Sequence, residues 1–231
     1  MSPPEAMLAP LHDDLWELNA PLTVLGMALG HRMTVARLAD ASLWVHSPVE
    51  YSADVAAALA QLGPVGHVVA PNCVHDTYLE GWFAAYPQAR FHGAQDFARY
   101  RPDLKFTDTL GDTPPAAWAG LIDQHVLRGA PRLNETLFLH RPSRTLILTD
   151  LCFNLGRDMP FLSRVLLKLD DAYCKFGPSR LVRLVIKDRP AFRASLDHVL
   201  QWDFDRVIVS HGANLAAGGR EALREAFVFL N

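Results

Sequence analysis

The chain has 231 residues, enough for one large domain or two small ones, and half of them are hydrophobic. Charged residues make up 20%, and this balance excludes a chain that is disordered throughout. The formal net charge of -3 at pH 7 shows no basic excess, so nucleic acid is not an expected partner.

The first quarter of the chain is predicted to hold strands followed by a helix. Apolar runs bounded by turn residues favour strands in three segments: LWELNAPLTV (15–24), RMTVARL (32–38) and SLWVHSP (42–48). The alanine-rich segment that follows predicts a helix. Ser52 is its candidate N-cap, and Gly63 and Pro64 end it.

The middle of the chain alternates between short strands and other structure. GHVVAPN (66–72) predicts a strand that runs into a loop, and a helix is expected over 77–86, where Pro87 ends it. ARFHG (89–93) is typical of another strand, whereas 101–120 is rich in proline and turn residues and is expected to be a loop. Three more strands are predicted, with a turn at 141–144 between the last two: LIDQHVLRG (121–129), ETLFLH (135–140) and RTLILTD (144–150).

The last third is mainly helical. MPFLSRVLLKL (159–169) and RPAFRASLDHVLQW (189–202) predict helices, the second with Pro190 in its first turn. DRVIVSHG (205–212) predicts a buried strand, and GREALREAFVFL (219–230) a closing helix. Early hairpin-like strands followed by strands that alternate with helices indicate an α+β chain. Its strands form either two sheets or one large mixed sheet, covered by helices.

The three cysteines, Cys73, Cys152 and Cys174, form no CxxC pair. A zinc finger and a secreted disulfide framework are therefore not expected. No apolar run is long enough to span a bilayer, and the acidic N-terminal segment with Glu5 does not predict a signal peptide. The expected location is the reducing cytoplasm.

Three of the predicted strands end at side chains that can bind a metal or titrate. His75 and Asp76 follow the first of these strands, Asp150 ends the second, and His211 is at the end of the third. Strand ends of an α/β fold are common ligand sites because the rigid sheet positions the side chains at a solvent-facing edge. Two imidazoles and two carboxylates that met there would suit zinc, iron or manganese. Taken one by one, each residue could equally be a surface histidine, a helix cap or a turn former.

The order of these strand ends resembles the metallo-β-lactamase superfamily, and most closely a branch of it carried as a domain of unknown function. The similar segments are APNCVHDTYLEGW with YPQARFHG, ETLFLHRPSRTLILTDLCFN and WDFDRVIVSHG. The resemblance implies a single domain over residues 1–231, folded as an αββα sandwich of two mixed sheets flanked by helices. It also implies a metal site, because members usually carry an H-x-H-x-D-H loop followed by a histidine, a bridging aspartate and a last histidine.

The sequence departs from that pattern in the loop. One register places the final D-H pair of the motif on His75 and Asp76 in exchanged order, with Pro71 and Cys73 where the first two histidines belong. Asp150 then matches the bridging aspartate, His211 matches the last histidine, and the intermediate histidine is missing from VLRGAPRLNE. This register predicts a single metal held by His75, Asp76, Asp150 and His211. A second register aligns Asp76 with the family aspartate and predicts no functional site, and the sequence does not separate the two.

The resemblance implies hydrolysis of an ester, amide or phosphoester in a small-molecule substrate that the sequence does not identify. A divalent ion, zinc in the first place and otherwise iron or manganese, would lower the pKa of a coordinated water. Asp76 or Asp150 would orient that water as general base. The alternatives are an iron-dependent oxidoreductase and a catalytically inactive binding protein without metal. The oligomeric state is left open.

Two further features have competing interpretations. Cys73 could supply a soft ligand, or Cys73 and Cys152 could respond to oxidation, but both also fit as small buried hydrophobes. The apolar and basic segment 157–193 could form a pocket wall that attracts an anionic substrate, or an interaction or membrane-associating surface. It could also consist of core-packed helices with solvated basic edges.

Overall fold

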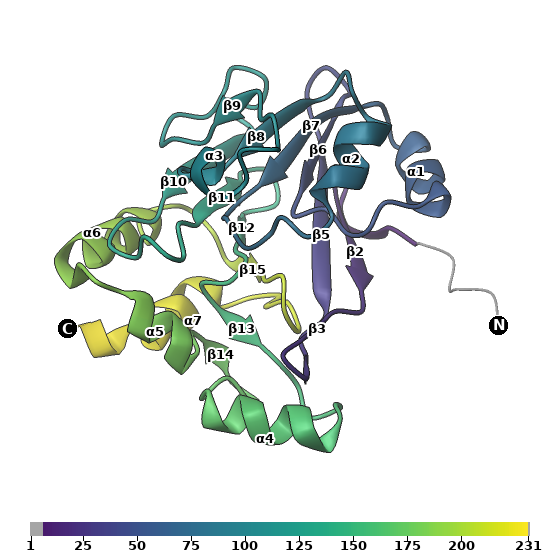
Figure 1. Cartoon of the computed structure of the whole chain (residues 1–231). Helices are drawn as coiled ribbons and strands as arrows, with labels where there is room; N and C mark the ends of the chain where they lie inside the picture. The colour runs from purple at the N-terminus through teal and green to yellow at the C-terminus, as the bar shows by residue number, and fades with distance from the viewer. Residues whose placement is uncertain (1–6, 231) are drawn as a thin grey trace. The chain divides into compact units, whose positions relative to one another are not determined.

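The computed structural model describes residues 7–230, which form two compact units (Figure 1). The first unit runs to Ala20 and resumes over Arg32–Leu110, and the second comprises Pro21–His31 and the chain from Gly111 onward. None of the helices in this described part of the chain is long and apolar enough to cross a membrane. The prediction about a signal peptide rests partly on Glu5, which lies outside the described residues.

The first unit is built on a seven-stranded sheet with the order β1-β2-β5-β6-β7-β8-β9. The strands are β1 (Ala9–His12), β2 (Leu15–Ala20), β5 (His31–Arg37), β6 (Leu43–His46), β7 (Val65–Ala70), β8 (Arg90–Gly93) and β9 (Asp108–Thr109). Strands β5 and β6 pair antiparallel, whereas β6, β7, β8 and β9 pair in parallel. The loops after β6 and β7 therefore leave the sheet at the same edge.

Three helices belong to this unit: α1 (Ala53–Ala60), α2 (Leu79–Ala85) and α3 (Phe97–Tyr100). Helix α1 begins as predicted, because the Ser52 hydroxyl accepts a hydrogen bond from the Val55 N–H at 3.2 Å. Trp82 of α2 is fully buried in the apolar core and donates its indole N–H to the Val49 carbonyl at 2.7 Å. This bond satisfies the one polar atom of the ring and fixes α2, which follows the His75 loop.

The second unit contains a four-stranded sheet with the order β10-β11-β12-β15. Its strands are β10 (Ile122–Val126), β11 (Thr136–His140), β12 (Thr145–Ile147) and β15 (Arg206–Ile208). The first three pair antiparallel, and β12 pairs with β15 in parallel, with Ile147 opposite Ile208. Asp150 and His211 each come three residues after this pair, so the parallel register brings them to the same level at the ends of adjacent strands.

Two small strand pairs and the remaining helices complete the second unit (Figure 1). They are β3 (Thr23–Val24) with β4 (Met27–Ala28), β13 (Phe153–Asn154) with β14 (Phe176–Gly177), α4 (Phe161–Leu169), α5 (Arg180–Val185), α6 (Arg189–Val199), α7 (Gly219–Ala226) and the 3-10 turn Val228–Leu230. The core of this unit packs Phe192 and Leu196 of α6 with Leu146 of β12 and Val207 of β15. Helix α6 begins as predicted, with proline in its first turn and the Asp188 carboxylate as its cap.

The structure corrects two of the predicted elements. The run 15–24 is not one strand: β2 ends at Ala20, and Thr23–Val24 pairs with β4 in a separate hairpin. Pro21 lies at the break, where it has no N–H to continue a ladder. The predicted loop 101–120 contains the short strand β9, whose two residues are too few to give a periodic signal.

The buried histidine pair of β7 and β8 predicts a loss of stability in acid. His92 is 1% exposed, and its Nε2 lies 3.0 Å from His67 Nδ1. Burial, together with the charge on His67, lowers the pKa of His92 to about 4 from the 6.5 of a free histidine. The folded protein keeps this histidine in its neutral form, so the contribution of neutral His92 to the stability of the fold is complete above pH 6.5. It is lost as the pH falls toward 4. We expect a loss of about 3 kcal/mol in the free energy of unfolding over this window.

Urea unfolding at a series of pH values measures this effect. His92→Gln should flatten the pH dependence, whereas substitution of the exposed His198 by Gln should leave it as in the wild type. If the free energy of unfolding changed with pH equally in the wild type and in His92→Gln, His92 would not be the group responsible.

Candidate metal centre

The loop after β7 presents His75 and is folded by its own polar side chains. Asn72 Oδ1 accepts hydrogen bonds from the backbone N–H groups of Val74 and His75, both at 3.0 Å. Such a turn is common where an asparagine side chain bonds to the backbone that follows it. His75 Nδ1 lies 2.6 Å from the hydroxyl oxygen of Ser47, which follows β6. Because this contact holds Nδ1, Nε2 is the His75 nitrogen that would bind a metal.

Asp76, the next residue, has a different contact. Its Oδ2 accepts a hydrogen bond from Arg101 Nη1 at 2.7 Å. The same guanidinium also bonds to Glu80 and Asp103 at 2.7 Å. The Arg101 contacts tie the loop to the segment after α3. The sequence predicted Asp76 as a metal ligand and a candidate general base. In the structure its carboxylate forms an ion pair with Arg101.

Asp150 stands on a segment that a buried carboxylate holds in place. Glu135, which is 0% exposed, accepts three backbone N–H bonds from the chain after β12. Its Oε1 accepts from Thr149 at 2.7 Å, and its Oε2 accepts from Asp150 at 2.9 Å and Leu151 at 2.8 Å. Hydrogen bonds to an ionised acceptor are among the stronger ones in proteins, so Glu135 fixes the backbone from which the Asp150 side chain projects.

Opposing effects act on the pKa of the Glu135 carboxyl group. Burial raises the pKa of its carboxyl group to about 7, the charge of Asp150 acts in the same direction, and the hydrogen bonds from Thr149 and Leu151 oppose both. Glu135 was not predicted from the sequence, because a histidine is the ligand expected in the segment before β11. A recognisable signal was present, namely a lone carboxylate directly before the fully buried strand TLFLH.

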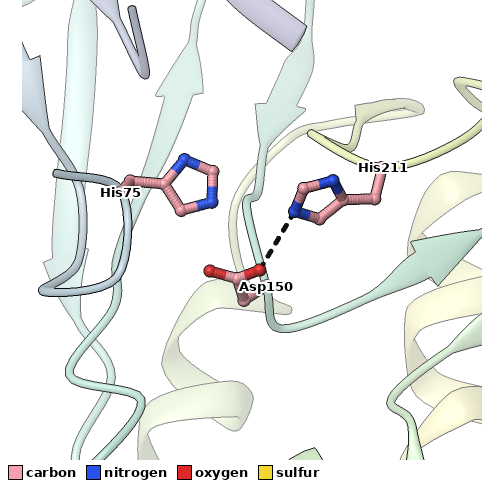
Figure 2. A group of neighbouring side chains, drawn as sticks. All are labelled: His75, Asp150 and His211. Atoms are coloured by element: carbon pink, nitrogen blue, oxygen red, sulfur yellow. Dashed lines mark hydrogen bonds and ion pairs between the residues drawn. The ribbon is translucent and has the colours of Figure 1, made fainter. Parts of the chain in front are cut away.

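His211 is held from both sides by oxygen atoms. Its Nδ1 lies 2.6 Å from the carbonyl oxygen of Gly30, and its Nε2 lies 3.1 Å from Asp150 Oδ1, a contact drawn in Figure 2. The ring also stacks on Phe153, with centroids 5.5 Å apart. Glycine is needed at the next position, since Gly212 has a φ of +103° and a Cβ there would be 2.1 Å from the carbonyl oxygen of Asn154. The SHG ending of the predicted strand therefore has a steric cause.

When Asp150 is ionised, these contacts require a positive charge between His211 and Asp150. The Gly30 carbonyl can only accept a hydrogen bond, so Nδ1 carries a hydrogen atom. An ionised Asp150 also only accepts, and it faces Nε2. Either the second proton of an imidazolium or a metal cation satisfies both atoms. Burial alone would lower the pKa of His211, but the hydrogen bond and charge of Asp150 outweigh it and raise that pKa.

The donor atoms also fit a metal ion. A histidine ligand commonly donates its other ring N–H to a backbone carbonyl, as His211 does to Gly30. Two donors that are each about 2.1 Å from one ion and 3.1 Å from each other subtend roughly 95° at the ion, between octahedral and tetrahedral ligand angles. Imidazole nitrogen with carboxylate oxygen is a ligand set that zinc, iron and manganese accept.

The structure therefore joins two of the four predicted ligands directly, Asp150 with His211. His75 projects from the loop after β7 of the first unit, with its ring labelled in Figure 2.

The two cysteines near the predicted site differ in their surroundings. The Cys73 thiol donates to the Gln95 carbonyl at 3.3 Å. Cys152 is 0% exposed and packs in the core of the second unit. Burial, together with the charge of Glu135, raises the pKa of the Cys152 thiol well above its usual value. Cys152 thus fits the interpretation as a small buried hydrophobe, and thiolate chemistry is not expected of it.

The family model of a domain of unknown function, DUF4336, matches residues 12–178. No curated protein matches the sequence at a significant level.

Solved structures match over almost the whole chain. The DIM-1 metallo-β-lactamase exposed to ceftazidime is similar with a TM-score of 0.67 and 11% identity, covering 99% of both chains. A metallo-β-lactamase from Pontibacter korlensis gives a TM-score of 0.62 at 14% identity, covering 95% of this chain and 99% of that chain. The Flv1 flavodiiron core from Synechocystis sp. PCC6803 gives 0.67 at 12% identity, covering 98% of this chain and 61% of that chain. At these identities the similarity shows the fold alone. The predicted α+β fold of the metallo-β-lactamase type is confirmed.

Removal of the Glu135 charge should loosen the segment that carries Asp150. Glu135→Gln keeps the volume but turns an amide N–H toward backbone donors, so at least one of the three bonds is lost. We expect a loss of about 3 kcal/mol in the free energy of unfolding, measured by urea denaturation. Glu225→Gln, at an exposed position of α7, is the control and should cost nothing measurable. Equal stability of the two variants would mean that Glu135 does not hold this segment.

Proposed function

The chain belongs to the DUF4336 family, and on this premise we propose that it is a metal-dependent hydrolase with a mononuclear site. The proposed ligands are Asp150 and His211, which are in contact in the second unit, and His75, which the sequence predicts as the third. Zinc is the first choice of metal, with iron or manganese as alternatives.

The observation that carries the proposal is the pair of oxygen acceptors around the His211 ring. Gly30 fixes the hydrogen atom on Nδ1, and the Asp150 carboxylate at 3.1 Å then calls for a cation at Nε2. His75 supports the same assignment, because its Nδ1 is held by Ser47. Both histidines are therefore anchored through Nδ1 and would bind through Nε2.

A bound divalent ion would act as a Lewis acid that makes water acidic and polarises a carbonyl or phosphoryl oxygen. The protein would contribute the rest of the chemistry. Asp150 meets His211 through Oδ1, and its second oxygen is the proposed general base that orients the attacking water. Glu135 keeps this carboxylate in place through the backbone. The proposed substrate class is a small-molecule ester, amide or phosphoester.

In this proposal Asp76 is a structural residue of the His75 loop. Its carboxylate is bonded to Arg101, so we assign it to fixing the loop of His75 and leave the roles of ligand and base to the other residues. The proposed site consequently has two imidazoles and one carboxylate as protein ligands, which leaves positions open for water and substrate.

Two alternatives keep specific support. The similarity to the Flv1 flavodiiron core favours an iron-dependent oxidoreductase, which a 2-His-1-carboxylate set would also suit. The residues Pro71 and Cys73, where the superfamily loop has histidines, favour a catalytically inactive binding protein. The identity of the bound metal, followed by a screen of hydrolase substrates, separates the three functions.

Metal content is the first test. Protein purified without chelator should contain close to one divalent ion per chain. Loss of one ligand in His75→Ala, Asp150→Asn or His211→Ala should weaken metal affinity by at least about 100-fold, more than is typical for residues that only support ligands. His198→Ala removes an exposed histidine outside the group and should keep the wild-type content. Equal metal content in wild type, His211→Ala and His198→Ala would refute the site.

Asp76→Asn distinguishes a ligand from a residue that fixes the loop. We expect unchanged metal affinity and a loss of about 1 kcal/mol in the free energy of unfolding, because the variant weakens the contact with Arg101. Arg101→Ala should act in the same direction on stability, again without loss of metal. Metal titration and urea denaturation measure the two effects. Loss of metal in Asp76→Asn with retention in Arg101→Ala would restore Asp76 as a ligand.

A further inference from the structure

Helix α4 packs one side against its own unit and exposes large apolar residues on the other side. Ser163 and Leu167 are its buried residues. The Ser163 hydroxyl accepts a hydrogen bond from the Ala28 N–H at 3.0 Å and donates to the Gly26 carbonyl at 3.2 Å. The buried side of α4 therefore rests on the β3–β4 hairpin of the same unit (Figure 1).

The opposite side of α4 is apolar and exposed. Phe161, Val165 and Leu169 recur every four residues and are 73%, 37% and 64% exposed, and Leu162 beside them is 58% exposed. A surface helix of a globular protein normally presents polar residues on this side. Four large apolar side chains on one exposed helix side therefore mark a candidate interaction surface.

The tip of the β3–β4 hairpin extends this apolar surface. Leu25 is 85% exposed and Val24 is 39% exposed. Leu25 has a φ of +49°, an uncommon conformation for a branched side chain, which here turns the tip of the hairpin. The next residue, Gly26, faces α4, since a Cβ there would be 3.5 Å from a methyl carbon of Leu162. We call Val24, Leu25 and the four exposed apolar residues of α4 the apolar patch.

Cations border the apolar patch. The Arg164 guanidinium lies 5.8 Å from the centre of the Phe161 ring, and Lys168 Nζ lies 5.2 Å from the centre of the Tyr173 ring. Residues 157–169 hold three cations, Arg157, Arg164 and Lys168, and one acid, Asp158, so this segment has a net charge of +2 in a chain whose formal charge is -3.

The acids after α4 are engaged in contacts within the unit. The Asp170 carboxylate accepts the Leu181 N–H at 2.9 Å, and Asp171 pairs with Lys175 at 2.5 Å and Arg183 at 2.9 Å. These contacts join the end of α4 to the start of α5. They also leave the positive charge of Arg164 and Lys168 dominant beside the patch.

We propose that the apolar patch docks on the surface of an anionic lipid bilayer. Apolar side chains that enter the boundary of headgroups and acyl chains, bordered by arginine and lysine that pair with anionic headgroups, are the pattern of an interfacial helix. Charge complementarity favours this occupant over a second copy of the chain, since two apposed patches would bring Arg164 and Lys168 of both copies together. The inference does not depend on the proposed hydrolase activity.

Vesicle co-sedimentation of the full chain tests the proposal. The probes are vesicles of phosphatidylcholine alone and of equal parts phosphatidylcholine and phosphatidylglycerol. The wild type should sediment with the anionic vesicles, bind the neutral ones much more weakly, and be released as the salt concentration rises. Phe161→Ser with Leu169→Ser should weaken binding to anionic vesicles by at least roughly tenfold. Arg164→Glu with Lys168→Glu should also weaken binding to anionic vesicles and remove the preference for anionic lipid. Each cation near the surface contributes roughly fivefold to the affinity for an anionic membrane.

A matched control lies on α3 of the first unit. Arg99 and Tyr100 are exposed there, so Arg99→Glu with Tyr100→Ser changes one charge and one apolar side chain away from the patch and should bind as the wild type does. Circular dichroism of each variant shows that the fold is kept. A wild type that remains in solution with anionic vesicles would overturn the proposal. Equal binding of the wild type and the Phe161→Ser, Leu169→Ser variant to anionic vesicles would also overturn it. The same holds if light scattering shows a wild-type dimer that becomes a monomer in this variant, while neither protein binds vesicles.

Discussion

The imidazole of His211, placed between a backbone carbonyl and a carboxylate, is the constraint on which the candidate site depends. Gly30 determines which ring nitrogen carries hydrogen, and an ionised Asp150 favours a positive charge at the other nitrogen. In a buried position such a charge is costly unless it is compensated, so the arrangement persists only because carbonyl, carboxylate and cation match one another. A proton or a metal ion can complete it, and the chemistry available to the protein depends on which of them does.

The rest of the second unit supports this interaction. The parallel pairing of β12 with β15 brings Asp150 and His211 to the same level, and glycine at position 212 permits the close approach to Asn154. Glu135 adds a second buried carboxylate, which the backbone N–H groups of three successive residues stabilise. A negative charge of this kind beside Asp150 makes a cation in the site more favourable, which is the electrostatic logic of a metal centre.

Much of the framework could be predicted from the sequence, and the failures have physical causes. Ser52 as a helix cap, Pro190 in a first turn and the strands that lead to Asp150 and His211 depend on local signals, and these predictions were confirmed, although the strands end three residues before Asp150 and His211. Partners that are distant in sequence could not be predicted: Gly30 lies 181 residues from His211. The contact of Asp76 with Arg101 could not be predicted either, because Arg101 comes from another segment and follows no recognisable spacing.

The account is tested most directly by an anomalous-scattering crystal structure of the zinc-loaded protein. It predicts one zinc peak, bonded to Nε2 of His75, to the carboxylate of Asp150 and to Nε2 of His211, at about 2.0–2.2 Å from each donor atom. Asp76 should remain on Arg101 in that structure. The central claim would be contradicted by an absence of zinc between Asp150 and His211, with Nε2 of His211 donating a proton directly to the carboxylate.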